Sequence, residues 1–378
     1  MLFVIDETIA DVLELGDENC QETKDIVEVL TSLAISWKHG KHIIYSSRPA
    51  LKKLSESSLL GKFSECYKRI ELDLTTIKEY KNKLIRHIEI VSGSRKKIYI
   101  PQCQESGGKK VLIIPVSQLA KDNSIFDKTM LLCEEDDDQY FYVKITEIYK
   151  LISRIKCPLQ YESSIPSGHG DKTGDYYKKI QEEARHLCLC IADSDRKFPS
   201  DSHKATACKI VDNDDPSKLL TEHFIIDVHE IENLIPTDLI RSVISNRRTI
   251  DSIKILDKHY PEARLFLDLK KGLKLVEILD QGGKEKFCEY WRNVIQETGL
   301  YCNEFCTDLP NCSSKDKCTC TIFEGNITLR KVIKHLQNEN LSDHKLKEML
   351  DKNLEKKWCE IGSLVWAWCC GSQRKSGL

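Results

Sequence analysis

Apolar and polar residues follow one another along the first third of the chain in the order of buried strands and amphipathic helices. Short runs rich in apolar and β-branched residues predict strands, at Leu2–Ile5, His42–Tyr45, Lys97–Ile100 and Val111–Val116. Apolar residues at helical spacing predict helices at Ile26–Trp37 and Arg48–Glu56. Strands that alternate with helices predict an α/β domain over residues 1–125.

The same alternation continues through residues 126–280 and then gives way to a helical pattern. Strands are predicted at Met130–Cys133, Leu187–Ala192 and Phe224–Val228, and helices at Tyr140–Ile152 and Asp175–Leu187. This order favours a second α/β domain with a parallel sheet. We expect residues 281–378 to form a helical, cysteine-rich region, with helices at Gly283–Glu297, Thr328–Asn338 and His344–Lys356.

Carboxylates stand directly after two predicted strands of the middle segment. Glu134 follows the first strand, and Asp193 and Asp195 follow the second. Ligands of α/β sheets bind at the carboxyl ends of strands, and alternate residues of a strand share a face. We therefore expect the three side chains to lie close together, where Mg²⁺ or Mn²⁺ would offset their repulsion. The alternative is that they are ordinary polar residues of loops.

The segments LLCEEDDDQYFY (131–142) and LCLCIADSD (187–195) resemble the two signatures of the TOPRIM fold, which occurs in topoisomerases, primases and nucleases of the overcoming-lysogenisation-defect (OLD) type. Glu134 and Asp138 match the acidic residues of the first signature, and Asp193 and Asp195 match the Asp-x-Asp of the second. The glycine that usually follows the motif glutamate is Glu135 here. The resemblance implies a central TOPRIM-like domain with a parallel sheet.

Two later segments extend this resemblance. IIDVHEIENLIP (225–236) is similar to a segment that OLD-type and related bacterial defence proteins carry, and there Glu230 and Glu232 would complete a second metal site. FLDLKKGL (266–273) places Lys270 or Lys271 where such nucleases tend to have a lysine, which would stabilise phosphoryl charge. For His229 we expect a positioning or hydrogen-bonding role, with general-base chemistry as the alternative.

The resemblance implies a divalent-metal-dependent nuclease that cleaves DNA or RNA as an effector of bacterial anti-phage defence. Its catalytic residues would be Glu134, Asp193, Asp195 and Lys270, and its Mg²⁺ or Mn²⁺ ligands would be Glu134, Asp138, Asp193, Asp195, Glu230 and Glu232. Metal-activated water would attack the phosphodiester. Two alternatives stay open: a non-catalytic TOPRIM-fold scaffold or sensor subunit of an ATPase-containing complex, and a primase-type nucleotidyl transferase.

The start of the chain resembles a different nuclease fold. FVIDETIADVL (3–13), followed by a helix and GKHIIYSSRPALKKLSE (40–56), looks like the opening of a PIN-like domain. In that family an aspartate at the end of the first strand binds metal, and Asp6 matches it. Glu65, Asp73 and Asp127 are candidates for further acidic ligands. The alternative is an α/β scaffold or partner-docking domain without a site.

Residues 301–320, YCNEFCTDLPNCSSKDKCTC, contain enough thiols for a structural Zn²⁺ site, which needs four soft ligands. The candidate ligands are Cys302, Cys306, Cys312, Cys318 and Cys320. Their spacing differs from the common C-x₂-C pattern, and unligated cysteines in a loop are the alternative. Trp358, Trp366 and Trp368 predict an apolar element docked on the core, with a stacking surface for nucleic acid as the alternative; the two-residue spacing of the last two suits a strand.

Composition limits the partners and the compartment. A formal net charge of −2 gives no overall attraction to nucleic acid, so a nucleic-acid substrate would need a local basic surface. The chain lacks a GxxxxGK[ST] motif, so any ATP hydrolysis would come from a separate subunit. Assembly into a homo-oligomer stays open. Seventeen cysteines, a start without a signal peptide and the absence of a long apolar run favour a cytoplasmic protein without a membrane span.

Overall fold

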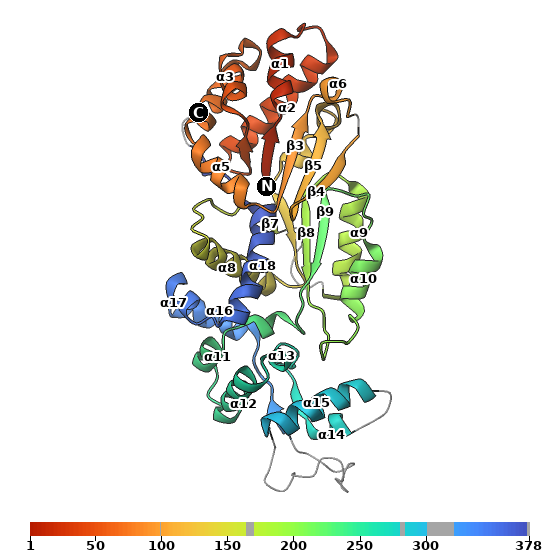
Figure 1. Cartoon of the computed structure of the whole chain (residues 1–378), viewed down its shortest axis with the longest axis vertical. Helices are drawn as coiled ribbons and strands as arrows, with labels where there is room; N and C mark the ends of the chain where they lie inside the picture. Colours follow the sequence, from red (N-terminus) through yellow and green to blue (C-terminus); the bar gives the residue numbers. More distant parts are fainter. Residues whose placement is uncertain (99, 164–169, 280–283, 301–320, 376–378) are drawn as a thin grey trace.

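The first of two main sheets lies at the N-terminal end of an elongated molecule (Figure 1). The structure is a computed structural model and describes residues 1–98, 100–163, 170–279, 284–300 and 321–375. The sheet has the order β2-β1-β3-β5-β4, with β4 antiparallel to β5 and all other pairs parallel. Its strands are β1 (Leu2–Ile5), β2 (Ile43–Tyr45), β3 (Arg86–Val91), β4 (Gln102–Ser106) and β5 (Lys109–Pro115).

The strands predicted from the sequence are confirmed for β1, β2 and β5. The prediction is wrong for the part of the chain between β2 and β5. The described residues of the predicted strand at 97–100 are not in a strand, because the chain makes a helical turn at Gly93–Lys96 and Lys97 adopts a left-handed conformation with φ 55°. The strand that lies at the centre of the sheet is β3, whose interspersed Arg86, His87 and Glu89 hide its apolar pattern. β4 is an exposed edge strand, for which the pattern of apolar residues gave no strand prediction.

Helices cover this sheet and bury the apolar stripe that their sequences carry. In α2 the residues Ile26, Val29, Leu30 and Leu33 are fully buried, at the helical spacing that the sequence shows. The helical segments of this part are α1 (Glu7–Leu15), α2 (Gln21–Lys38), α3 (Arg48–Glu56), η1 (Ser58–Phe63), α4 (Ser64–Leu72), α5 (Leu74–Lys83), α6 (Gly93–Lys96), α7 (Val116–Leu119) and η2 (Asn123–Phe126).

The second sheet lies below the first in Figure 1 and is parallel throughout, in the order β7-β6-β8-β9. Its strands are β6 (Thr129–Leu132), β7 (Tyr161–Ser163), β8 (Cys188–Ala192) and β9 (Thr221–Ile225). The helical segments between them are α8 (Asp136–Ile152), η3 (Gly170–Lys172), α9 (Thr173–Glu183) and α10 (Ala205–Asn213). The predicted α/β class with parallel strands is therefore confirmed for the chain.

The remainder is mainly helical, with one small antiparallel ribbon. Its helical segments are η4 (Ile231–Leu234), α11 (Thr237–Val243), α12 (Arg247–His259), α13 (Pro261–Arg264), α14 (Leu275–Leu279), α15 (Glu285–Thr298), α16 (Leu329–Asn338), α17 (Asp343–Glu348) and α18 (Lys352–Cys369). The ribbon pairs β10 (Gly272–Lys274) with β11 (Thr321–Glu324) and so joins segments on either side of residue 280. The boundaries proposed near residues 125 and 280 stay predictions.

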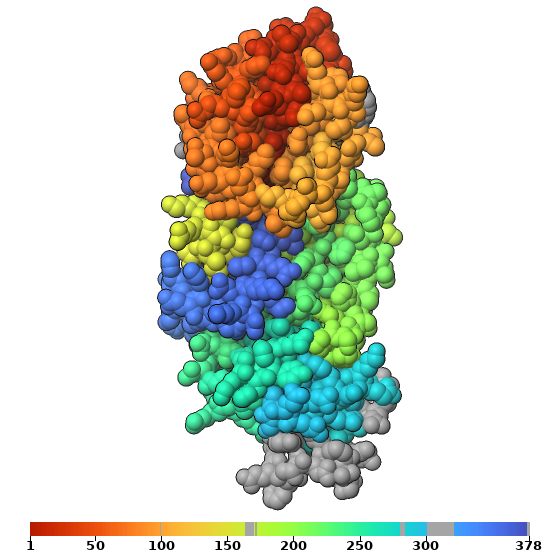
Figure 2. Space-filling view, viewed as in Figure 1, coloured from red at the N-terminus to blue at the C-terminus, as the bar shows by residue number. Residues whose placement is uncertain are grey.

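The last helix returns to the middle of the molecule. Figure 2 shows this blue segment between the orange N-terminal part and the teal helices. α18 packs along α8 so closely that a Cβ on Gly362 would lie 2.4 Å from the Cβ of Tyr149. Trp358, Trp366 and Trp368 are buried in this helix. The docked element is therefore confirmed, whereas the strand and the exposed stacking surface are wrong for these residues.

The two main sheets are joined by a polar cluster around Glu222 of β9. Its carboxylate lies 3.1 Å from Arg86 Nη1 of β3 and 2.5 Å from Lys110 Nζ of β5, and it accepts a hydrogen bond of 2.9 Å from the Trp368 indole. The Arg86 guanidinium also stacks on the Trp368 ring at 4.3 Å. One half-buried carboxylate thus contacts both sheets and the last helix. In the part of the chain that the structure describes, no helix is both long enough and apolar enough to cross a bilayer.

Candidate metal centre

Glu134 and Asp193 meet where two neighbouring parallel strands end. β6 and β8 pair with Leu132 opposite Cys190, so the residues that follow them leave the sheet at the same edge. The Glu134 Oε1 atom lies 3.3 Å from the backbone nitrogen of Asp193, which donates to it. Asp193 Oδ1 accepts a hydrogen bond of 3.1 Å from the backbone of Ile231. The sheet thus brings these two predicted residues together.

Asp195 approaches the same place by a different backbone path from the one expected. β8 ends at Ala192, as predicted, and Asp195 has a left-handed conformation with φ 53°, so the strand does not continue to Asp195 and the alternation of a strand does not apply to it. The Asp195 backbone nitrogen donates to the carbonyl of His229 at 2.8 Å, which holds this turn against the following segment. The charge of Asp195 contributes to raising the pKa of Glu134, so the two carboxylates still interact.

Asp138 joins the cluster from the first turn of α8. Its Oδ2 atom accepts a hydrogen bond of 3.0 Å from the backbone nitrogen of Glu135, and the Glu135 side chain completes the reciprocal cap of the helix. Glu135 has φ −136°, a conformation open to any residue, so the fold does not require glycine at this position. The departure from the family motif therefore leaves the local backbone unstrained.

The clustered, half-buried carboxylates shift one another toward the protonated state. Burial, followed by the charge of Asp195, raises the pKa of Glu134 to about 7. Burial and the charge of Glu134 raise the pKa of Asp138 to about 8. The pKa of Asp193 is raised well above its usual value by burial and by Asp138, and burial also raises that of Glu230. The cluster therefore favours binding of protons or of another cation.

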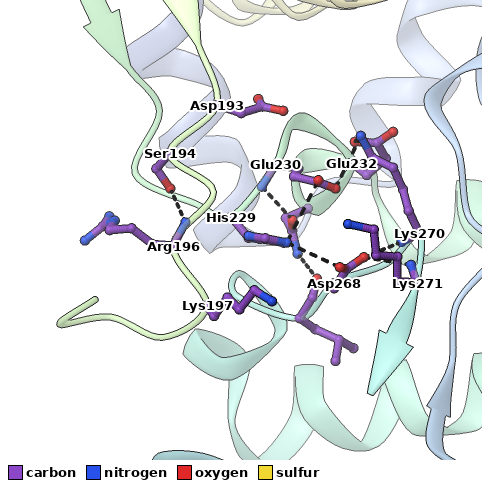
Figure 3. A network of polar contacts seen from close by, with 12 residues as sticks. Asp193, Ser194, Arg196, Lys197, His229, Glu230, Glu232, Asp268, Lys270 and Lys271 are labelled. Carbon is purple, nitrogen blue, oxygen red and sulfur yellow. Dashed lines mark hydrogen bonds and ion pairs between the residues drawn. The ribbon is translucent and has the colours of Figure 1, made fainter. Parts of the chain in front are cut away.

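Glu230, Glu232 and Lys270 form the next group along the same edge (Figure 3). Lys270 Nζ lies 3.3 Å from Glu230 Oε2 and 3.3 Å from Glu232 Oε2, and these charges raise the pKa of Lys270 although burial opposes the shift. Glu232 Oε1 also accepts a hydrogen bond of 3.1 Å from the backbone of Leu329. Of the two lysines that the sequence suggested, Lys270 is the one that faces the carboxylates.

His229 and Asp268 complete this edge, and the sequence interpretation overlooked Asp268. The His229 Nε2 atom lies 3.8 Å from Asp268 Oδ2 and 4.0 Å from Glu230 Oε1. Burial raises the pKa of Asp268, but its contacts with His229 and with the backbone of Lys271 lower it by more. The pKa of Asp268 is therefore below its usual value. A signal was present in the sequence, because Asp268 directly follows the apolar pair Phe266–Leu267 in the segment that supplied Lys270.

A cavity of about 540 Å³ opens beside Asp268. Aromatic side chains of Phe198, Phe266 and Trp291 line it, together with Lys197 and Lys271. The Trp291 indole donates to the carbonyl of Lys197 at 3.0 Å and so fixes this wall. The carboxylate edge is thus reached from a space that offers both apolar rings and positive charge.

These pKa shifts predict that metal-free protein loses stability as pH rises. The pKa of Asp138 is about 8 in the folded chain against its ordinary value of 3.8, so the folded state binds more protons between those values, and stability falls with pH until about 8. Asp138→Asn keeps the helix cap and removes this charge. We expect it to stabilise metal-free protein at pH 8 by about 1–3 kcal/mol, measured by urea unfolding.

The wild type should regain this stability with excess Mg²⁺, and the gain should be larger at pH 8 than at pH 5.5. Exposed Asp136 of the same helical turn supplies the matched control, Asp136→Asn, which should unfold like the wild type. Equal pH dependence in the wild type and Asp138→Asn would contradict the proposed charge repulsion.

The N-terminal candidates do not assemble around Asp6. Asp6 caps α1 by accepting a 3.0 Å hydrogen bond from Thr8, and it pairs with Lys96 at 3.1 Å. Asp127 pairs with Lys41 at 2.7 Å, before β2 begins and therefore at the opposite end of the sheet. Glu65 pairs with Arg69 on α4 and Asp73 with Lys375, both away from Asp6. The carboxylate whose charge interacts with Asp6 is Glu89 of β3, which the sequence interpretation overlooked.

The proposed zinc ligands Cys302, Cys306, Cys312, Cys318 and Cys320 lie outside the described residues. No protein-family model matches the chain, and neither a curated protein nor a solved structure gives a significant match.

Proposed function

We propose that the chain is a divalent-metal-dependent nuclease whose centre is the carboxylate edge of the second sheet. The observation that supports this most strongly is the position of Glu134 and Asp193. They follow adjacent parallel strands, with Asp138 and Asp195 close enough to raise the pKa values of the cluster. A half-buried group of like-charged carboxylates is unfavourable without a cation, and such an edge is where α/β proteins bind their ligands.

The donor set fits Mg²⁺ or Mn²⁺, because it consists of carboxylate oxygens. Glu134, Asp193 and Asp195 would hold one ion, and Asp138, Glu230 and Glu232 would complete a second site or orient the first. Within the described residues, the Oε2 atoms of Glu230 and Glu232 have no hydrogen-bond partner, and each is 3.3 Å from Lys270. When bound, such ions polarise the phosphate and supply a nucleophilic water.

The protein's own residues would bind and orient the substrate. The ammonium group of Lys270 lies between two carboxylates and can turn toward a phosphate oxygen that carries developing charge. The neighbouring cavity offers Lys197 and Lys271 for the phosphate backbone and the rings of Phe198 and Phe266 for a base. The whole lining carries five lysines and four carboxylates, so positive charge is concentrated at the lysines rather than spread over the cavity.

The proposal includes the resemblance to the TOPRIM family. The two acidic signatures fit a TOPRIM-like centre of the OLD type, and that type of nuclease implies a role in anti-phage defence beside a separate ATPase subunit. The PIN-like interpretation of the N-terminal domain has less support, since Asp6 is engaged by Thr8 and Lys96. A zinc site in residues 301–320 stays a prediction.

The test is cleavage of a mixed panel of plasmid, single-stranded DNA and total RNA in Mg²⁺ and in Mn²⁺, with chelator as the metal-free arm. We expect the wild type to cleave at least one class and the Asp193→Ala/Asp195→Ala protein to cleave none. Cleavage that survives in this double variant but is lost in Asp6→Ala would move the chemistry to the N-terminal domain.

The same assay separates the other two functions. Products that lengthen only with nucleoside triphosphates would indicate a nucleotidyl transferase. If the wild type turns over no substrate and the double variant still binds its partner as the wild type does, the nuclease proposal is wrong. The non-catalytic scaffold would then be the favoured function.

A further inference from the structure

His229 has an unusual environment for a buried histidine. Its side chain is 3% exposed, and neither ring nitrogen has a hydrogen-bond partner among the described residues. Its backbone is held on both sides, because its nitrogen donates to Leu265 at 2.9 Å and its carbonyl accepts from Asp195 at 2.8 Å. Leaving a buried polar group without a partner destabilises a fold, so a bound ligand would account for the position of this ring.

Each of the two carboxylates nearest to the His229 ring is oriented by contacts with other residues, and each has one oxygen that faces the ring (Figure 3). Asp268 Oδ1 accepts backbone hydrogen bonds from Lys270 at 3.1 Å and Lys271 at 2.7 Å, while Oδ2 faces His229. Glu230 Oε2 lies 3.3 Å from Lys270, and Oε1 lies 4.0 Å from His229 Nε2; the Glu230 side chain is also held as the cap of η4, where it accepts a hydrogen bond from the backbone nitrogen of Asn233. This division of roles is typical of metal ligands that are oriented by outer hydrogen bonds.

The distances between His229 and the two carboxylates also suit three ligands that share one ion better than they suit direct hydrogen bonds. The separations of 3.8 Å and 4.0 Å from His229 Nε2 are too long for hydrogen bonds. The three ligand atoms, one from each of His229, Glu230 and Asp268, lie within 4.8 Å of one another. Ligands bonded at about 2.0–2.2 Å to one ion stand about 3–4 Å apart, so a small contraction would bring these three to coordination distance.

We propose that His229, Glu230 and Asp268 form a binding site for a divalent transition-metal ion, with His229 Nε2 as the nitrogen ligand. One imidazole nitrogen and two carboxylate oxygens favour Mn²⁺, Fe²⁺ or Zn²⁺ over Mg²⁺, which prefers oxygen alone. Asp268 lines the 540 Å³ cavity, so an ion can enter from that side. The site differs from the carboxylate cluster of Glu134 and Asp193 and shares only Glu230 with the proposed nuclease ligands.

The test is Mn²⁺ binding to the metal-free full-length chain, followed by electron paramagnetic resonance. Mn²⁺ is a suitable probe because it binds thiolates poorly, so the seventeen cysteines do not obscure the result. Pulsed measurements detect the hyperfine coupling of a directly bound imidazole nitrogen. We expect this coupling in the wild type, its loss in His229→Ala, and its retention in Asp193→Asn, which alters only the carboxylate cluster.

His223→Ala is the matched control. His223 lies on β9, pairs with Asp214 at 3.2 Å and is outside the proposed ligand set. The nitrogen coupling should therefore remain in His223→Ala. If His229→Ala does not fold, as judged by circular dichroism, Asp268→Asn provides a second measurement and should weaken nitrogen-coupled Mn²⁺ binding by about tenfold or more.

The proposal is overturned by Mn²⁺ that binds without nitrogen coupling, by coupling that persists in His229→Ala, or by unchanged affinity in Asp268→Asn. Because the readout is binding, its failure leaves the nuclease proposal intact. Conversely, a chain without cleavage activity can still show the nitrogen-coupled ion.

Discussion

Asp193→Asn is expected to lower the rate of metal-dependent phosphodiester cleavage by about a thousandfold, which corresponds to about 4 kcal/mol of transition-state stabilisation. Asp193 has the central position in the cluster, since its backbone contacts Glu134 and its Oδ1 accepts from Ile231. The amide keeps the size and the acceptor oxygen while it removes the charge. The loss should therefore come from weaker metal binding and charge stabilisation rather than from altered packing.

The measurement is the single-turnover cleavage rate on the substrate class that the wild type selects, at saturating Mg²⁺ or Mn²⁺. Asp212→Asn is the matched control, because Asp212 is an exposed aspartate on α10 beside the same sheet. It should cleave at the wild-type rate. Lys270→Met should have an intermediate effect, about 10- to 100-fold. A rate for Asp193→Asn within about threefold of the control would remove this carboxylate from the proposed centre.

Glu222→Ala should lower the free energy of unfolding by about 3–5 kcal/mol, because it leaves a buried positive charge without its partner. Arg86 is 6% exposed and depends on Glu222 for its charge partner between the sheets, although it also donates to the carbonyl of Leu219. The Trp368 indole would lose its acceptor at the same time. Since these contacts join both sheets and α18, their loss should weaken the whole molecule.

The measurement is urea unfolding of Glu222→Ala against Glu105→Ala. Glu105 is exposed on the edge strand β4 and lies 3.8 Å from the same lysine, Lys110, so its removal should change stability by less than about 0.5 kcal/mol. Glu222→Gln should fall between the two, because it retains an acceptor for Trp368. Equal stability of the Glu222→Ala and Glu105→Ala proteins would show that the sheets are held by apolar packing alone.

Several elements of the fold were predictable from local pattern. β1 and β8 are continuous apolar runs, and the buried stripe of α2 stands at helical spacing in the sequence. β3 was not predictable in this way, because Arg86 is stabilised by Glu222, which lies on a strand of the other sheet. The exposed β4 forms because β5 offers it hydrogen bonds, and its own residues carry no burial signal.

The residues of the candidate site also fall into two groups: those that local pattern predicts and those that depend on tertiary structure. The sequence by itself determined that carboxylates follow β6 and β8, since strand ends can be read from where apolar runs stop. It also supplied Lys270, Glu230 and Glu232, which the structure brings to one edge. Only the tertiary structure decided that Asp268 faces His229, that Asp195 approaches through a left-handed turn, and that Glu89 rather than Asp127 lies beside Asp6. Those contacts depend on how distant segments cross, and local spacing carries no information about such crossings.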